Sequence, residues 1–133
     1  MLRGAAFLTA VLVAAPAAAD EHARPARFQA TAYCQTGTTA SGTQTRPGVI
    51  AADPRVFPRG TVIRVDAPLR GYSGTYRVED TGLAVKGRVI DIYVPDCKAA
   101  KRFGRRHVMV RVIERGPEVE LAAKEVPVRS KER

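Results

Sequence analysis

The stretch RVIDIYVPDCKAAKRFGRRHVMVRVI, residues 88–113, decides the fold. It opens with apolar and β-branched residues at 89–94 that alternate with the period of two typical of a strand. Residues 97–103 have the composition of a short helix, with Asp96 placed to cap its start and Gly104 placed where helices stop. The stretch therefore predicts a strand, a short helix and a second strand.

Strand-like runs recur on both sides of this helix. They contain alternating and β-branched residues, while helical periodicity is nearly absent. Together with 89–94, the expected strands are 28–33, 49–52, 61–65, 74–78 and 107–113. Six short strands separated by turns are typical of a small closed barrel. We therefore expect an all-β fold, a six-stranded barrel with one short helix.

The length of 133 residues corresponds to one domain. Residues 1–19 carry Arg3, then an apolar run and a terminal Ala-rich segment, which is the pattern of a secretory signal peptide and is too short to span a bilayer. We expect export, cleavage and no membrane span in the mature chain. Polar, proline-containing segments at 20–27 and 114–133 are expected to be flexible, which leaves the barrel domain at 28–113.

Charge and cysteine content narrow the class of protein. The chain has 22 Lys and Arg against 13 Asp and Glu, a net charge of +9. Nucleic acid is a common partner of so basic a chain, but export and the scarcity of aromatic residues argue against it.

In an oxidising compartment we expect Cys34 and Cys97 to form a disulfide. Catalysis by a cysteine is disfavoured because only His22 and His107 could serve as its base. A metal site is also not expected, because neither histidine has other metal-ligating residues near it in the sequence.

Acidic residues are few in the expected barrel, so each is considered as a candidate for a structural or a catalytic role. They are Asp53, Asp66, Glu79, Asp80, Asp91 and Asp96. Asp91 is the most unusual, because it interrupts an apolar strand. Desolvation there would raise its pKa, as a general acid requires, but an Asp that binds backbone N–H groups at a barrel end fits equally well.

The other acids have ordinary structural interpretations. Asp80 begins Asp-Thr-Gly, where its side chain could close a turn. The same triplet occurs in aspartic protease half-sites, but Glu79 precedes it where such sites are apolar, and there is no second copy. Asp53 precedes Pro54, a setting typical of a capping residue.

Three motifs in order resemble the 3D domain, a family named for three aspartates. They are TTASGTQTRPGVIAADPRVFPRGT (38–61), DTGLAVKGRVIDIYVPD (80–96) and CKAAKRFGRRHVMVRVI (97–113). The family is similar to the barrel of MltA-type lytic transglycosylases. The resemblance implies a six-stranded double-psi β-barrel that acts on bacterial peptidoglycan. Leu83 departs from the family pattern, which has a second Gly there.

The resemblance also implies roles for residues of this chain. The three aspartates fall on Asp53, Asp80 and Asp91, of which Asp91 would be the catalytic acid/base, Asp80 would stabilise charge and Asp53 would be architectural. A substrate groove would be lined by Thr39, Ser41, Gly42, Thr81, Gly82 and Lys86. No metal or other cofactor is implied.

The function implied is exported lytic transglycosylation, cleaving the β-1,4 bond between N-acetylmuramic acid and N-acetylglucosamine to leave a 1,6-anhydro sugar. The partner would be the glycan strands of peptidoglycan, whose carboxylates would be attracted to a basic protein, in the periplasm or outside the cell. The oligomeric state is not specified. Two alternatives stay open: a non-catalytic barrel that binds or loosens the wall, as expansin-like domains do, and a hydrolytic muramidase.

Overall fold

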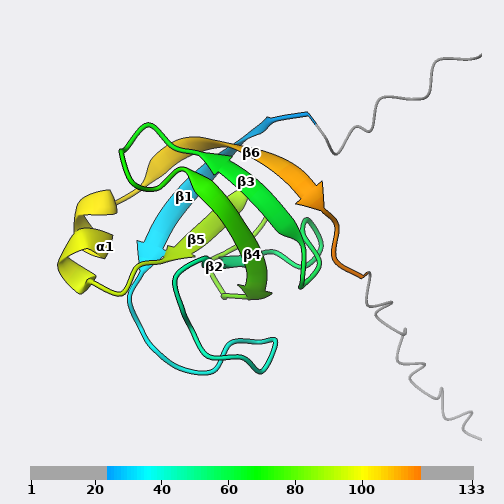
Figure 1. Cartoon of the computed structure of the whole chain (residues 1–133), viewed down its shortest axis with the longest axis horizontal. Helices are drawn as coiled ribbons and strands as arrows, with labels where there is room; N and C mark the ends of the chain where they lie inside the picture. The colour runs from blue at the N-terminus through cyan, green and yellow to red at the C-terminus, as the bar shows by residue number, and fades with distance from the viewer. Residues whose placement is uncertain (1–23, 118–133) are drawn as a thin grey trace, which may run out of the picture.

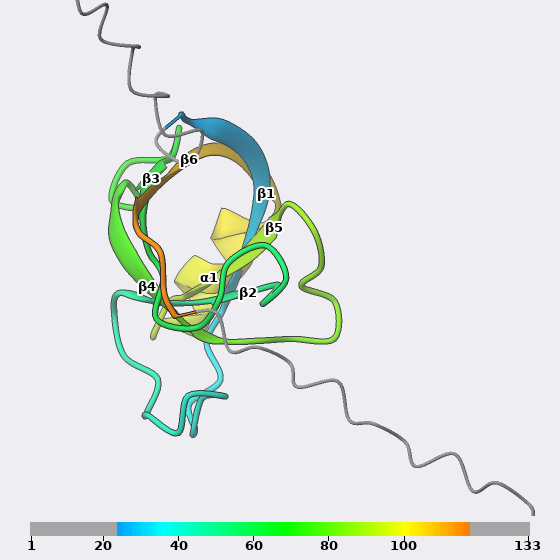
Figure 2. The same cartoon turned by 90° about the vertical axis from the view of Figure 1, so that its right-hand side faces the viewer.

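The computed structural model describes residues 24–117, so the predicted signal peptide lies outside the described residues. It has six strands and one helix, whose bounds are β1 (Ala26–Tyr33), β2 (Val49–Ala52), β3 (Val62–Asp66), β4 (Gly74–Asp80), β5 (Val89–Tyr93), α1 (Cys97–Phe103) and β6 (Arg106–Glu114). The strands close into a barrel in the order β1-β5-β2-β4-β3-β6. Figure 2 looks into the ring that they form. The predicted all-β barrel with one short helix is confirmed.

The barrel combines two parallel strand pairs with antiparallel ones. β1 pairs in parallel with β5, and β2 with β4, while the other neighbours are antiparallel. Parallel neighbours cannot be joined by a tight hairpin, so the chain must travel between them. Segments that are distant in the sequence therefore lie side by side, and this brings the site together.

Alternate residues of each strand fill the barrel. Phe28 and Ala30 of β1 and Ile90 and Ile92 of β5 are buried in one core with their counterparts from the other strands. Successive strand residues point to opposite faces. Residues between these core positions, such as Thr31, consequently lie on the outer face of the barrel.

Helix α1 covers one end of the barrel. Asp96 accepts hydrogen bonds from the backbone N–H groups of Lys98 and Ala99, and Gly104, with φ of 60°, ends the helix as predicted. Phe103 is buried, and its ring lies 4.7 Å from that of Tyr72 between centroids. Both ends of the described chain lie on the opposite side of the molecule from α1 (Figure 1). The helix is far too short to cross a membrane, and none of the described residues belongs to a longer one.

A disulfide fastens the helix to the first strand. Cys34 follows β1 directly, Cys97 is the first residue of α1, and the two are bonded, as predicted from the cysteine count. The bridge closes a loop with a sequence separation of 63 residues. It therefore fixes the end of β1 against the end of the barrel that α1 covers.

Three strands are longer than their sequence patterns indicate. β6 runs from Arg106 to Glu114, one residue beyond the expected 107–113 at each end. β1 begins at Ala26 because that residue still pairs with Val110 of β6. β4 continues to Asp80, past an irregularity in its pairing with β2 between Ile50 and Ala51. The extension places Asp80 in a strand, although the sequence predicted it in a turn.

Asp53 joins the end of β2 to the segment that leads into β5. The side chain is only 2% exposed, and its Oδ2 accepts a hydrogen bond from the backbone N–H of Gly87 (2.9 Å). Its Oδ1 accepts from the backbone N–H and Nε of Arg55, whose Nη2 binds Oδ2 at 2.9 Å. These hydrogen bonds, first of all those from the Arg55 side chain, hold the pKa of Asp53 well below its usual range. Asp53 therefore fixes where the β4–β5 segment returns to the barrel.

We expect the disulfide to carry a large share of the stability. Replacing Cys34 and Cys97 by Ser should lower the free energy of unfolding by about 4 kcal/mol, because the unfolded chain regains the entropy of an open loop. Denaturant unfolding of the variant, and of the unchanged protein with and without a reductant, measures this. Equal midpoints for all three would contradict it.

Asp53→Asn should lower the free energy of unfolding by about 1–3 kcal/mol, because one amide oxygen cannot accept four hydrogen bonds and its NH₂ group faces other donors. The control is Asp66→Asn, since Asp66 is exposed and makes only a 3.4 Å ion pair with Arg64. The pKa of Asp53 is lowered in the folded state. The stability it confers is therefore present above the ordinary aspartate pKa of ~3.9 and is lost as the pH falls below that value. Acid unfolding that is the same in both variants would contradict this assignment.

Candidate functional site

One row of four residues crosses the outer face of the barrel. Thr31 of β1 is in register with Asp91 of β5, Asp91 with Ala51 of β2, and Ala51 with Asp80 of β4. Neighbouring strands lie about 4.8 Å apart, so the backbones carrying Asp80 and Asp91 are separated by roughly 10 Å. The structure thus places two carboxylates that are eleven residues apart in the chain on one row, with a single methyl side chain between them.

Asp91 is the carboxylate whose environment favours the protonated form. It is half-buried, and its Oδ1 accepts a hydrogen bond from the Thr31 hydroxyl at 2.9 Å. Burial raises the pKa of Asp91, the negative charge of Asp80 raises it further, and the hydrogen bond from Thr31 opposes both. Asp91 is therefore suited to hold and donate a proton.

Asp80 holds the turn that follows β1. Its Oδ1 accepts hydrogen bonds from the backbone N–H groups of Ala40 (3.0 Å) and Thr81 (2.9 Å). Among residues 24–117 no hydrogen bond is made to its Oδ2. Asp80 thus combines a structural role with a carboxylate oxygen left available beside Asp91.

Two tyrosines continue the site along the strands that carry Thr31 and Asp91. Tyr33 is in register with Tyr93, and their ring centroids are 5.4 Å apart. The Tyr33 hydroxyl is the one buried side-chain polar atom in the described part of the chain that lacks a hydrogen-bond partner. Burial raises the pKa of Tyr33 strongly, and the charges of Asp80 and Asp91 add to the rise. Because the charges of both carboxylates act on the Tyr33 phenol, we assign Tyr33 to the same site as Asp80 and Asp91.

Sequence reasoning missed Tyr33. Its position two residues after Thr31, on the same face of an alternating strand, was the available signal.

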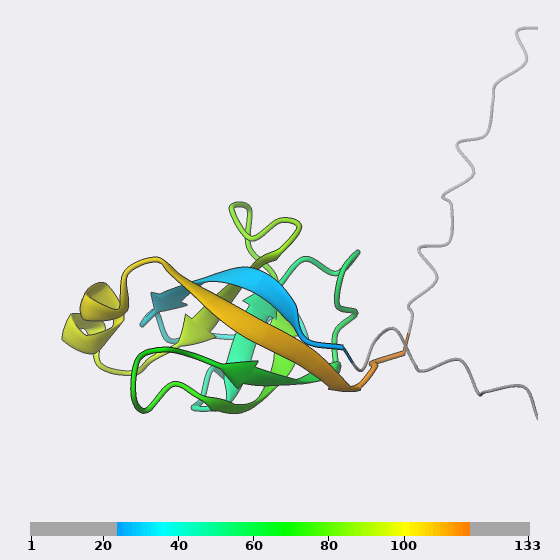
Figure 3. The same cartoon turned by 90° about the horizontal axis from the view of Figure 1, so that it is seen from above.

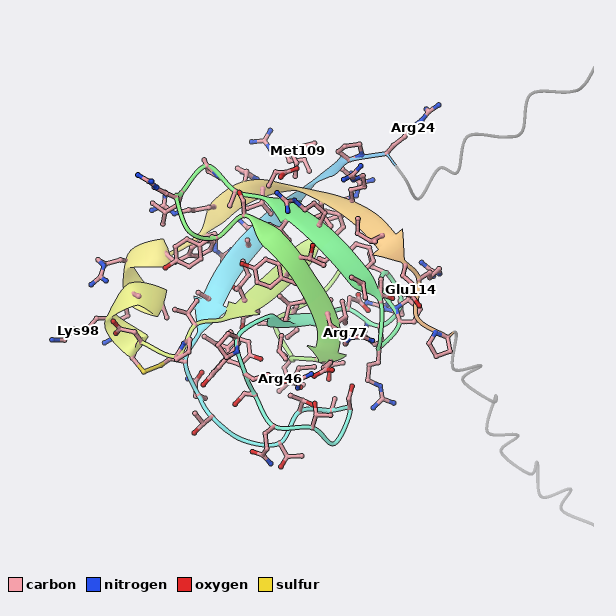
Figure 4. All side chains as sticks on the ribbon, in the orientation of Figure 1. Arg24, Arg46, Arg77, Lys98, Met109 and Glu114 are labelled. Carbon is pink, nitrogen blue, oxygen red and sulfur yellow. A yellow bond between two sulfur atoms is a disulfide. The ribbon has the colours of Figure 1, made fainter. Side chains whose placement is uncertain are left out.

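Glu79 was counted among the acids of the barrel, as a turn residue or a helper beside Asp80, but was not placed in the site. It is buried and accepts hydrogen bonds from the Thr43 hydroxyl and from Arg46, each at 2.9 Å. The bond from Arg46 is the main reason why the pKa of Glu79 is lowered. Arg77 also acts electrostatically on Glu79, and Figure 4 shows Arg46 and Arg77 on the same side of the molecule. Glu79 fixes the segment between β1 and β2, so it supports the site without lying in the row.

The predicted groove residues of this segment differ in their exposure. Thr39 is buried and its hydroxyl shares a 3.0 Å hydrogen bond with that of Thr43, so it supports the turn. Ser41 and Gly42 are exposed, and the backbone N–H of Ser41 donates to the Glu79 carbonyl. The Arg59 guanidinium donates to the carbonyl of Ala40.

The segment between β4 and β5, residues 81–88, protrudes from the barrel (Figure 3). It carries the other three predicted groove residues, of which Thr81 and Lys86 are exposed. A Cβ on Gly82 would lie 2.9 Å from Cγ2 of Val85, so this turn has no room for a side chain there. Leu83, the third residue of the segment, is 99% exposed. The segment therefore presents both an apolar and a cationic side chain to solvent.

The chemistry available in the row is proton transfer. Asp91 has a raised pKa, and a second carboxylate lies two strands away, across β2. Within residues 24–117, His, Cys, Asp and Glu side chains form no group of three that could hold a metal ion. A carboxyl that holds a proton beside an ionisable neighbour can serve as a general acid and then as a base.

Two proteins of Bacillus subtilis are similar in sequence to this chain. The cell wall shaping protein YabE of Bacillus subtilis is 36% identical over 89 residues, covering 62% of this chain and 21% of the relative. The cell wall-binding protein YocH of the same organism is 35% identical over 103 residues, covering 71% of this chain and 34% of the relative. The chain thus spans between a fifth and about a third of the length of these relatives.

Among solved structures, MltA from Escherichia coli, described as a lytic transglycosylase fold, is similar with a TM-score of 0.50 and 26% identity. The similarity covers 62% of this chain and 29% of MltA. The family model of the 3D domain matches residues 48–114, from the start of the buried strand β2 to the end of β6. The strands that place Asp53, Asp80 and Asp91 are those of this family, and the chain is therefore a member of the 3D domain family.

Proposed function

We propose that the protein is an exported lytic transglycosylase of peptidoglycan. The observation that carries the proposal is the row in which Asp91, with its raised pKa, lies two strands from Asp80, with only Ala51 of β2 between them. The similarity to MltA supports the fold of such an enzyme, and the names of YabE and YocH support a place at the cell wall. The disulfide supports an oxidising location, in the periplasm or outside the cell.

In the proposed reaction Asp91 first acts as the acid. It donates its proton to the glycosidic oxygen while the bond from that oxygen to C1 of the muramic sugar breaks, and an oxocarbenium-like centre develops at C1. Asp80, as a carboxylate on the far side of β2, stabilises the positive charge electrostatically. The N-acetylglucosamine leaves with a free hydroxyl.

Asp91 then acts as the base. It takes the proton from the C6 hydroxyl of the same muramic sugar while that oxygen attacks C1, which closes the 1,6-anhydro ring and returns Asp91 to its protonated form. The nucleophile belongs to the substrate, so no water has to be activated. One carboxyl with a raised pKa and one charge-stabilising neighbour are sufficient, which suits a barrel with so few acids.

Binding without cleavage is the second candidate. The relative YocH is described as cell wall-binding, and this chain covers 34% of it. In that case the row would serve to hold a glycan, and Asp91 would exchange hydrogen bonds with sugar hydroxyls. The following experiment separates the two candidates.

Asp91→Asn should abolish the release of anhydro-muramyl fragments from purified sacculi, with a loss of at least about 10²-fold, because an amide cannot donate and then accept the proton. Mass spectrometry of the soluble fragments measures the product. Asp66→Asn is the matched control and should cleave like the unchanged protein. Reducing ends would instead indicate hydrolysis, and binding to sacculi without fragments would reject the catalytic proposal.

The pH dependence should report the Thr31 hydrogen bond. Cleavage requires a protonated Asp91, so the rate should fall as the pH rises through the raised pKa of that residue. Thr31→Val removes the hydrogen bond that lowers this pKa, and the alkaline limb of the profile should therefore move to higher pH, while Thr31→Ser should leave it near its original position. A limb that moves to lower pH in Thr31→Val would contradict the role given to Asp91.

A further inference from the structure

We infer that an arginine-rich groove beside the carboxylate row binds the carboxylates of the peptide stems of peptidoglycan. The inference rests on the proposed function, because it gives that site a preference for one class of substrate: glycan that carries acidic peptide over bare glycan. The groove is lined by Arg27, Phe28, Gln29, Arg88 and His107 and has a volume of about 440 Å³.

The groove continues the outer face on which the row lies. Phe28 and Ala30 point into the core, so Arg27, Gln29 and Thr31 share the opposite face of β1. At about 3.3 Å per residue, Gln29 lies roughly 7 Å and Arg27 roughly 13 Å along the strand from Thr31. A peptide attached to the lactyl group of a muramic sugar at Asp91 needs two to four extended residues to cover this distance.

The charges that line the groove are unopposed. Arg27 and Arg88 are exposed, and within the described residues neither takes part in an ion pair. His107 is in register with Gln29, whose Oε1 accepts a hydrogen bond from Arg105 at 3.2 Å. No lining residue carries a negative charge. By contrast, Arg46 and Arg55 bind Glu79 and Asp53, so elsewhere on this barrel arginines do have carboxylate partners.

Arginine is the side chain best suited to such a ligand. Its planar guanidinium binds a carboxylate through two parallel hydrogen bonds, and it is more weakly hydrated than an ammonium group. Arg88 also ends the protruding segment that Asp53 holds through Gly87, so its backbone position is fixed. A second hollow shares Phe28 and Arg88 and is also lined by Arg24, which extends the positive surface toward the start of β1.

The test compares glycan strands in three forms: with intact stems, with stems whose carboxylates have been chemically amidated, and with stems removed by an amidase. Dissociation constants for each form are measured by sedimentation or titration with the disulfide-bonded protein. We expect tightest binding to the intact form. The double variant Arg27→Ala/Arg88→Ala should lose roughly tenfold in affinity for that form and bind the other two forms as the unchanged protein does.

A matched control removes two positive charges elsewhere. Lys98 and Lys101 are exposed on α1, and Figure 4 shows Lys98 at the far end of the molecule from Arg24, which precedes β1. Lys98→Ala/Lys101→Ala should keep the preference for intact stems. If both double variants lose affinity equally, the attraction is one of net charge and the groove is no subsite.

The outcomes separate this inference from the proposed function. Equal binding of all three forms by the unchanged protein, or an arginine variant that keeps the preference, would overturn the groove while leaving cleavage at Asp91 untouched. An unchanged protein that shows the arginine-dependent preference yet releases no fragments would uphold the groove and reject the enzyme. Binding to none of the forms would overturn both.

Discussion

The site depends on the position of one four-residue strand. β2 lies between β4 and β5 and is buried along its whole length, so it can carry only small or apolar side chains. Where it separates Asp80 from Asp91 it presents Ala51, whose methyl group leaves space between the two carboxylates. A larger side chain would occupy the place where their charges interact. Burial is the main cause of the raised pKa of Asp91, and the charge of Asp80, which adds to it, acts across a strand that itself has no polar side chain.

The acids of the barrel whose pKa is shifted fall into two groups that differ in the direction of the shift. Asp53 and Glu79 are buried with arginine partners, which lower the pKa of each carboxyl. Their hydrogen bonds hold neighbouring loops in place. Asp91 is half-buried with only a hydroxyl as its partner, and its pKa moves in the opposite direction. The two carboxyls with a lowered pKa thus have a guanidinium partner that balances their charge, and the one with a raised pKa has none.

The sequence was sufficient for those features that depend on near neighbours. The period of two at 89–94, the cap at Asp96 and the stop at Gly104 are local signals, and the structure contains the strand and the helix that they predict. The order of strands is not local, because alternation shows which residues share a face and not which strand lies beside them. Asp80 and Asp91 could be connected beforehand only through the family resemblance. Tyr33 was not expected in the site, and Glu79 was noticed only as an acid without a settled role. What distinguishes them, a phenol near two carboxylates and an acid held by Arg46, exists only after closure of the barrel.

β1 makes the whole arrangement sensitive to strand slippage. This strand pairs with β5 on one side and β6 on the other, and it carries the groove arginine Arg27, the hydroxyl of Thr31, the phenol of Tyr33 and, just beyond its end, the bridging Cys34. A shift by one residue would turn Phe28 and Ala30 to solvent and the polar set into the core, which the burial of those apolar groups forbids. A shift by two would preserve the faces, but it would pull the cysteines out of bonding distance. Core packing therefore excludes a shift of β1 by one residue, and the disulfide excludes a shift by two. Together they fix the register of β1 with β5 and β6, and so the positions of the side chains that β1 carries.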